Sequence, residues 1–391
     1  MTVMPSTTLA DTIEWLNDSC PGAESTDLVL PELCGRLIGH GVPLAYGGIF
    51  IRTLHPEIMG RRFIWRPGMP VEATSVGYDL FDDPEYRGSP IAWVFANGER
   101  LRRRLGDPDC PNDFTFLDRF RADGATDLVI SPLRYSGGEV HVAAWMTQLP
   151  GGFPDHAVAM LHAIERPVAR MAEIRTLKRI AVNLLDTYVG GQAGGRILGG
   201  HIRRGDIEAI RAAIWLSDMR GFTARADRMP PADLVELLNR YFDCQVPAIR
   251  EAGGEVLKFM GDGLLAIFPV GDAGEAAVCR AVLSAARTIE AAIAGADWGG
   301  LEAPGGMKFG VALHVGEVMY GNVGSVNRLD FTCIGPAVNL AARIEKLSGE
   351  IGRTILASAD FARHCGDAHL APLGAFALKG VAAEQTVYGL A

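Results

Sequence analysis

The second half of the chain carries the clearest hydrophobic pattern, because short apolar runs alternate there with longer amphipathic segments. Residues 231–251 place apolar side chains at helical spacing, and Pro247 late in that span is expected to kink or end the helix. The Asp262-Gly263 pair between two apolar runs predicts a hairpin turn. The predicted elements are, in order, a strand at 212–217, a helix at 231–251, strands at 255–260 and 264–268, a helix at 273–294, and strands at 309–315 and 317–320.

This order of elements predicts an α+β fold with a ferredoxin-like βαββαβ core. Such a fold hosts many unrelated activities, so it indicates no function by itself.

The first half of the chain also mixes helix and strand. An amphipathic helix is predicted at 9–16, and a Gly137-Gly138 pair predicts a hairpin turn. Strands are predicted at 44–51, 62–65, 91–96, 128–132 and 139–147. This layout is similar to that of a GAF domain, with a PAS domain as the alternative. The resemblance lies in the order of elements and implies a sensor that holds a small-molecule ligand of unknown identity.

A long helix is predicted between the two halves, from about residue 155 to 190, because apolar residues recur there at helical spacing. Its apolar stripe indicates either packing on its own domain or a parallel helix pair between two copies of the chain. The glycine-rich stretch 190–195 is expected to break this helix. We therefore expect three parts: a sensor domain at 1–160, a helical linker and transducer at 161–208, and a third domain at 209–391.

The composition is that of a soluble globular protein, with 48% hydrophobic and 21% charged residues among 391. A net charge of −9 argues against a nucleic-acid partner. No run approaches the roughly 20 apolar residues that span a bilayer, and no signal peptide is evident at the N-terminus. The seven cysteines are scattered without a CxxC motif. We therefore expect a cytoplasmic protein without a membrane span.

Two carboxylates stand out in the third part. Asp218 follows the predicted strand 212–217, and Asp262 sits at the tip of the predicted hairpin between two glycines. Adjacent strands of a ferredoxin-like sheet would bring both to one edge, where they suit Mg²⁺. After Asp218 the chain turns through Gly221 into a helix whose free N–H groups would cradle a triphosphate, so Gly221 and Phe222 are expected to bind the substrate. The structural alternative is that Asp218 caps a helix and Asp262 forms a turn.

Three segments resemble the signature segments of class III nucleotidyl cyclases, in that family's order and spacing. They are Asp218-Met-Arg-Gly-Phe-Thr223, Lys258-Phe-Met-Gly-Asp-Gly263 and Gly335-Pro-Ala-Val-Asn-Leu-Ala-Ala-Arg343. The segment 310–324 and the closing Leu378-Lys379-Gly380 are also similar to that family. The resemblance covers the third part of the chain and implies an adenylate cyclase that makes cyclic AMP from ATP.

The resemblance also implies roles for individual residues. Two ions per active site, Mg²⁺ or Mn²⁺, would be bound by Asp218, the Met219 carbonyl and Asp262. Lys258 and Thr332 would read the adenine. The remaining substrate contacts would come from Asn339 and Arg343, which orient the ribose and stabilise the transferring phosphate, and from Lys379, which contacts the terminal phosphates.

Thr332 is a departure, since many members of the family have aspartate there, and threonine resembles the subgroup called class IIIb. Its hydroxyl can still accept a hydrogen bond from the adenine amine. The resemblance implies a homodimer with the active site between two copies, because only one such domain is present. Asp218 and Asp262 would then come from one protomer and the other substrate-contacting residues from its partner. The alternatives are a guanylate or dinucleotide cyclase, or a catalytically silent regulatory protein that binds a nucleotide.

Overall fold

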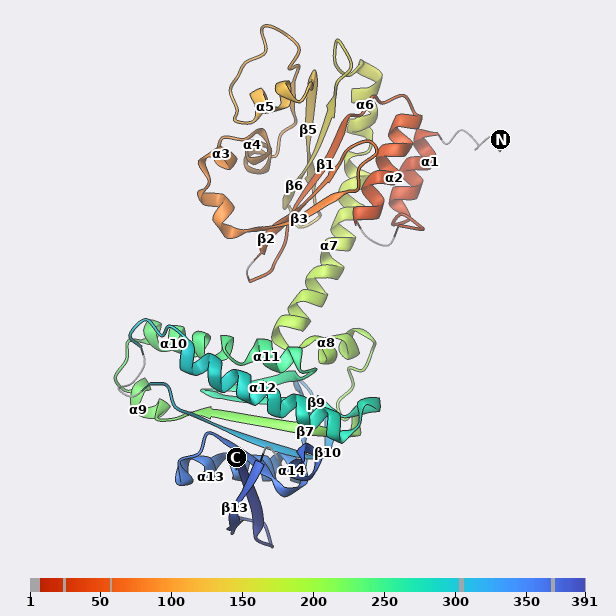
Figure 1. Cartoon of the computed structure of the whole chain (residues 1–391). Coiled ribbons are helices and arrows are strands. Elements are labelled where there is room, and N and C mark those ends of the chain that lie inside the picture. Colours follow the sequence, from red (N-terminus) through yellow and green to blue (C-terminus); the bar gives the residue numbers. More distant parts are fainter. Residues whose placement is uncertain (1–7, 24–25, 57, 302–305, 367–369, 391) are drawn as a thin grey trace. The chain divides into compact units, whose positions relative to one another are not determined.

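The computed structural model describes residues 8–23, 26–56, 58–301, 306–366 and 370–390. The chain divides into two compact units, Met1–Asn183 and Leu184–Ala391. Each unit contains its own sheet with helices on its faces (Figure 1). No helix in the described part of the chain is both long enough and apolar enough to cross a membrane.

The first unit is built on a six-stranded antiparallel sheet with the strand order β3-β2-β1-β6-β5-β4. Its strands are β1 (Tyr46–Arg52), β2 (Ile58–Trp65), β3 (Glu72–Gly77), β4 (Leu101–Arg103), β5 (Asp127–Arg134) and β6 (Val140–Thr147). Its helices are α1 (Leu9–Asn17), α2 (Thr26–Gly39), the 3₁₀ turn η1 (Tyr78–Asp82), α3 (Pro84–Arg87), α4 (Pro90–Asn97), α5 (Leu117–Ala122) and α6 (Asp155–Ala163).

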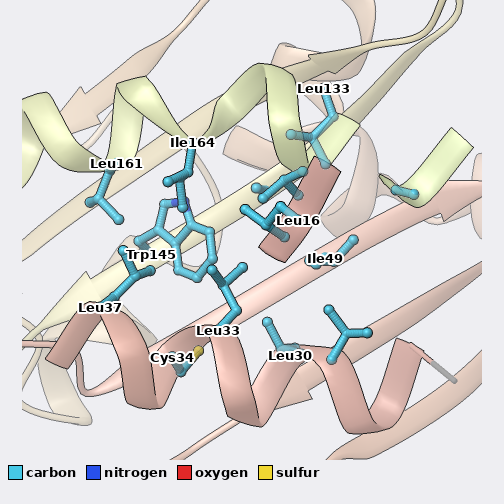
Figure 2. Packing of buried hydrophobic residues seen from close by; sticks show 14 of the residues in the cluster. Leu16, Leu30, Leu33, Cys34, Leu37, Ile49, Leu133, Trp145, Leu161 and Ile164 are labelled. Carbon is cyan, nitrogen blue, oxygen red and sulfur yellow. The ribbon is translucent and has the colours of Figure 1, made fainter. Parts of the chain in front are cut away.

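One face of this sheet packs against α1, α2 and α6. Figure 2 shows the side chains of Leu33, Leu37 and Leu161 gathered around the indole of Trp145, which is 1% exposed. Helices that bury one apolar stripe against a sheet gain most of their stability from that packing rather than from helix propensity. The opposite face contributes Leu128, Ile130, Val142, Ala144 and Met146 to a second, smaller core beneath α4 and α5.

The predicted strand at 91–96 is wrong, because these residues form helix α4. Ser89 caps this helix by accepting a hydrogen bond from the Ala92 N–H (3.1 Å), and Pro90 occupies its first turn. Gly98 ends it in the left-handed region at φ 66°. The other four strands predicted for this unit are present, whereas β3, β4 and α2 were not expected.

The predicted helix from 155 to 190 is interrupted near Ile164, so that α6 is followed by a separate helix, α7 (Glu165–Tyr188). Ile164, Val168 and Met171 are buried in the first unit's core, whereas Ile174 and Leu177 are exposed. The glycine-rich stretch ends α7 as expected, with Gly190 at φ 97°. The glycines that follow are not a loop, because they lie within helix α8 (Gly191–Leu198).

The second unit is built on an eight-stranded sheet with the order β13-β14-β12-β10-β7-β9-β8, in which β11 pairs with β10. Its strands are β7 (Ile207–Met219), β8 (Glu255–Met260), β9 (Gly263–Pro269), β10 (Phe309–Ser325), β11 (Arg328–Ile334), β12 (Ile355–Ser358), β13 (Leu370–Phe376) and β14 (Gln385–Leu390). After α8, its helices are α9 (Phe222–Ala226), α10 (Pro231–Asp243), α11 (Val246–Glu251), η2 (Gly271–Ala273), α12 (Glu275–Gly295), α13 (Pro336–Ile351) and α14 (Ala359–Cys365).

Four strands of this sheet lie in the order β10-β7-β9-β8, and each is antiparallel to its neighbour. This is the strand order expected of a βαββαβ core. Helices α10, α11 and α12 lie over one face of β7, and α13 lies on the other (Figure 1). The alternation of Trp215 toward the first face and Ile214 toward the second buries the strand on both sides.

Two predicted elements in this unit differ from the structure. The predicted strands 309–315 and 317–320 are one continuous strand, β10, because Gly316 remains paired with Ala212 of β7. The predicted helix 231–251 is divided into α10 and α11. Pro247 stands in the first turn of α11, where its missing N–H costs no hydrogen bond.

Candidate active site

The carboxylates of Asp218 and Asp262 lie next to each other at one edge of the second unit's sheet. Ser217 of β7 pairs with Leu264 of β9, so Asp218 lies beside the two-residue turn that joins β8 to β9 and contains Asp262. A side-chain carbon added at Gly263 would lie only 3.8 Å from Asp218 Oδ1, which shows how closely the turn approaches this carboxylate. The turn depends on Gly261, whose φ of 68° favours glycine.

Their proximity has an electrostatic cost when both are ionised. Burial and, next to it, the neighbouring Asp218 carboxylate together raise the pKa of Asp262 to about 7, while backbone N–H groups act in the opposite direction. A divalent cation would relieve this repulsion, because two carboxylates are the hard oxygen ligands that Mg²⁺ and Mn²⁺ accept. Within the described ranges, no group of three or more His, Cys, Asp or Glu side chains could hold a metal. The pair would therefore need carbonyl, water or phosphate oxygens to complete a coordination sphere.

A buried polar pair lies directly behind Asp218. The Ser217 hydroxyl donates to the Gln245 side-chain oxygen at 2.7 Å, and both residues are almost completely buried. Tyr241 is also buried nearby, and desolvation raises the pKa of its hydroxyl, as does the charge of Asp218. These groups fix the end of β7 against α10 and α11. The sequence gives no local signal for these groups, because Ser217 on β7, Tyr241 on α10 and Gln245 between α10 and α11 meet only in the folded chain.

Lys258 lies on β8 and forms an ion pair with Asp330 of β11. Its side chain is 36% exposed. Thr332 lies two residues beyond Asp330 on the same strand and pairs with Gly321 of β10. Alternate residues of a strand share one face, so Asp330 and Thr332 point to the same side. The structure therefore groups Lys258 with the strand that carries Thr332, through a carboxylate that the sequence analysis did not single out.

Asn339 and Arg343 lie one helical turn apart on α13. The opposite side of this helix buries Ala337, Ala341 and Ile344 in the sheet, so both polar residues face away from that core. Gly335 precedes the helix with φ 145°, and Pro336 occupies its first turn. Of the described carboxylates, none forms an ion pair with the Arg343 guanidinium, which leaves its donors available.

Helix α13 is tied to the end of β7 by a further contact. Arg220, two residues after Asp218, forms an ion pair with Glu345 (3.1 Å) and donates to the Ser348 hydroxyl. Burial raises the pKa of Glu345, while Arg220 acts to lower it. This contact couples the helix of Asn339 and Arg343 to the strand of Asp218. It joins residues far apart in sequence, so no local motif predicted it.

The remaining predicted residues are Gly221, Phe222, Lys379 and Met219. Gly221 has φ 73° and precedes the five-residue helix α9, whose first residue is Phe222. The Phe222 ring packs partly against the larger core of the second unit. Lys379 is exposed in the turn after β13. Met219, the last residue of β7, has a buried side chain and is 3% exposed.

Comparison with known proteins identifies this unit. The family model described as the adenylate and guanylate cyclase catalytic domain matches residues 208–390. These residues form a cyclase catalytic domain. All of the site residues named above lie inside this cyclase domain, including Asp330, Arg220 and Glu345.

The curated relatives match less than half of this chain. The adenylate cyclase of Anabaena cylindrica is 33% identical over 164 residues, which is 42% of this chain and 32% of that protein. The terminal-differentiation specific adenylate cyclase of Dictyostelium discoideum is 35% identical over 156 residues, or 39% of this chain and 7% of that protein. The chain therefore spans less than a third of the length of either relative.

Solved structures similar to the cyclase domain include enzymes named for either nucleotide. The adenylyl cyclase CyaB from P. aeruginosa is 24% identical with a TM-score of 0.41, covering 47% of this chain and 95% of its own. The guanylyl cyclase Cya2 is 27% identical with a TM-score of 0.39, covering 47% and 93%.

Proposed function

We propose that the chain is an adenylate cyclase that converts ATP into 3′,5′-cyclic AMP and pyrophosphate. The observation that carries this proposal is the pair of adjacent carboxylates, Asp218 and Asp262, at the sheet edge of a cyclase domain. The named relatives at 33% and 35% identity are adenylate cyclases, which supports the same reaction.

Asp218, Asp262 and the Met219 carbonyl would hold two ions, Mg²⁺ or Mn²⁺. The half-buried, mutually repelling carboxylates favour a divalent cation at this point. When bound, such ions lower the pKa of the attacking ribose hydroxyl and neutralise charge on the phosphates. Gly221 and Phe222 follow on the same edge, and the N–H groups of this turn would contact the triphosphate.

The ribose 3′ hydroxyl would attack the α-phosphate and expel pyrophosphate. Asn339 would hold the ribose in position for this attack, since it lies exposed on the same face of α13 as Arg343. The Arg343 guanidinium would stabilise the charge that builds up on the transferring phosphate. Lys379 would bind the terminal phosphates of the leaving group.

Lys258 and Thr332 would select adenine over guanine. A lysine ammonium can donate to an adenine ring nitrogen, whereas guanine presents N–H donors at that edge. The Thr332 hydroxyl can accept from the exocyclic amine. The family description includes both adenylate and guanylate cyclases, so it does not decide between ATP and GTP. Lys258 and Thr332 favour ATP.

The complete site would form between two copies of the chain. Asp218 and Asp262 would come from one protomer, and Lys258, Thr332, Asn339, Arg343 and Lys379 from its partner. Large apolar side chains beside the predicted base-binding residues are exposed in the single chain, namely Phe259 (52%), Met260 (46%) and Ile334 (44%). Exposed apolar groups of this size are typical of surfaces that another protein covers.

The first unit would act as a GAF-like sensor domain that regulates the cyclase domain. Support comes from its separate antiparallel sheet with helices on both faces. Residues 161–208, which include α7 and α8, would be the transducer.

Product formation by the purified full-length chain tests the proposal, with ATP and GTP supplied in parallel and Mg²⁺ or Mn²⁺ present. Cyclic AMP from ATP alone is the expected result. Cyclic GMP would show that the base assignment to Lys258 and Thr332 is wrong, but it would not affect the assignment of the two carboxylates Asp218 and Asp262. No product from either, in the full chain and in residues 209–391 alone, would favour a silent nucleotide-binding protein.

A further inference from the structure

The first unit contains a cavity of about 840 Å³ between its sheet and the segment that carries η1, α3, α4 and α5. This volume lies within the range of roughly 300–1,000 Å³ typical of small-molecule sites. All of the lining residues belong to this unit, so the cavity is independent of the cyclase site. The chemistry of its lining residues indicates the class of molecule that it would hold.

The floor of the cavity is the sheet face opposite the Trp145 core. The strand register places Phe50 of β1 opposite Arg62 of β2, and Arg62 opposite Thr74 of β3. Tyr46 and Phe50 therefore project on the same side as Arg62. A side-chain carbon added at Gly48 would lie 2.9 Å from Tyr46 Oη and 3.0 Å from Phe50 Cε2. Glycine at this position leaves the two rings free to lie over the strand as an aromatic floor.

The roof and walls are also largely apolar. Above the aromatic floor, the cavity is lined by apolar side chains from β3, η1, α4, α5 and the residue that precedes α5, and these are Val76, Leu80, Ile91, Phe95, Phe120 and Phe116. An apolar body of moderate size would thus be surrounded by rings and aliphatic groups. Aromatic walls of this kind contribute both buried area and stacking to a flat ligand.

Arginine side chains also line the cavity, between these apolar groups. The Arg52 guanidinium lies 4.5 Å from the ring centroid of Phe95 and 5.5 Å from that of Phe81. No ion pair joins Arg52 or Arg119 to a carboxylate in the described segments. An arginine that lies against aromatic rings keeps the N–H groups along its edge available for a planar anion.

Arg62 adds a second unsatisfied donor. Its Nε is buried without a hydrogen-bond partner among the described residues, although its Nη2 lies 3.3 Å from Glu72. A buried N–H without a partner is costly, and a bound oxygen would satisfy it. Glu72 is shared with Arg66 at 3.7 Å, so one carboxylate faces two guanidinium groups. The other lining carboxylates are Asp83, which caps α3, together with Glu85 and Asp123.

We propose that this cavity binds a small organic anion with a flat, apolar body. The rings of Tyr46, Phe50 and Phe95 would hold the body, and Arg52 and Arg62 would bind the negative group, be it carboxylate, phosphate or sulfonate. This inference concerns binding alone and stands whether or not the cyclase domain makes cyclic AMP.

Two matched fluorescent probes test it on the full-length chain. Anilinonaphthalene sulfonate is a flat aromatic anion, and phenylnaphthylamine has the same ring body without the charge. We expect the anion to bind saturably and about a hundredfold more tightly than the neutral probe, which corresponds to one charge-assisted hydrogen bond from each of the two arginines.

The variants Arg52→Gln and Arg62→Gln should each weaken binding of the anion about tenfold and leave binding of the neutral probe nearly unchanged. Arg103→Gln is the matched control, because Arg103 also lies over an aromatic ring (Phe114, 5.2 Å) and pairs with Asp113 but does not line the cavity. Its affinity for both probes should match that of the wild type.

Loss of folding does not imitate the expected result, since partly unfolded chains bind the anionic probe more strongly. The thermal midpoint of each variant shows whether it has lost its fold. If one of the two arginine variants has, Arg119→Gln is used in its place, because Arg119 also lines the cavity and is exposed on α5. The proposal is overturned if the two probes bind equally well, or if removing these arginines leaves the affinity for the anion unchanged.

Discussion

Lys258 of β8 and Asp330 of β11 form an ion pair at the point where the cyclase domain would read the base. The carboxylate fixes the position of an ammonium group that otherwise ends a flexible four-carbon chain. Because Thr332 lies two residues from Asp330, the same contact holds the two predicted base-reading groups on neighbouring strands. In the proposed function, Asp330 would therefore position Lys258.

Replacing Asp330 by Asn should impair recognition of ATP more than the chemical step. We expect the KM for ATP to rise about tenfold and the preference for ATP over GTP to fall, with a smaller change in kcat, since a misplaced lysine no longer matches one base. Steady-state kinetics with both nucleotides measure this. Glu236→Gln, which breaks an exposed ion pair with Arg240 on α10, is the control and should change neither value. Equal losses of kcat for both nucleotides would contradict the assignment.

Replacing either Asp218 or Asp262 should lower activity without lowering the stability of the fold. We expect Asp218→Asn and Asp262→Asn each to lower turnover by about a hundredfold or more, because preorganised charge at the phosphates is lost. In chelator, each variant should melt no lower than the wild type, because the repulsion between the two carboxylates is gone.

Mg²⁺ provides the matching readout for the same variants. The ion should raise the thermal midpoint of the wild-type chain and leave that of each variant unchanged, because binding to the folded state alone stabilises it. An equal rise in all three proteins would place the ion elsewhere.

Two inactive chains should restore activity when mixed. If each site takes Asp218 from one protomer and Arg343 from the other, a dimer of Asp218→Ala with Arg343→Ala contains one intact site and one doubly damaged site. Random exchange of subunits then gives about a quarter of the wild-type activity. Cyclic AMP formation in the mixture measures this. A mixture that forms mixed dimers yet stays inactive would show that both residues act within one chain.

A buried histidine should make the cyclase domain less stable in mild acid. His314 is 4% exposed, its Nδ1 lies 2.7 Å from the Ser358 hydroxyl, and burial lowers its pKa to about 4 from 6.5. The unfolded chain therefore takes up a proton between these values while the folded chain does not. The contribution to stability is complete above pH 6.5 and is lost as the pH falls toward 4.

Urea unfolding at about pH 7 and about pH 5 checks this prediction. His314→Asn should reduce the difference in unfolding free energy between the two conditions by about 2 kcal/mol. His156→Asn, at an exposed position, should leave that difference unchanged. A His314→Asn variant with the same difference between the two pH values as the wild type would contradict the prediction.

Local patterns predicted the elements of the cyclase domain from β7 to β10, but not β11 to β14 or the helices α13 and α14. The hairpin around Asp262 carries its turn residues within a few positions, so its place followed from sequence. The segment 91–96 did not, because its apolar run fits a strand as well as a helix, and only the Ser89 cap and Gly98 decide between them.

The long-range polar contacts could not be predicted from the sequence, for a different reason. Arg220 with Glu345, and Lys258 with Asp330, join residues separated by many positions, and each member taken alone is an ordinary surface charge. Their significance depends on strand order and register. The cavity of the first unit was equally hidden, because its cations come from separate strands and a helix.

Strand β7 is paired with β10 along its whole length in the middle of the cyclase domain. It runs without interruption from Ile207 to Met219, a span of about 40 Å at the usual rise per residue. One end follows directly from the segment 199–206 after α8, and the other carries Asp218. Since β7 is hydrogen-bonded on both sides along much of this length, it cannot stretch or bend easily. Because no loop interrupts β7 between Ile207 and Asp218, we expect a displacement of the chain at Ile207 to move Asp218 with it.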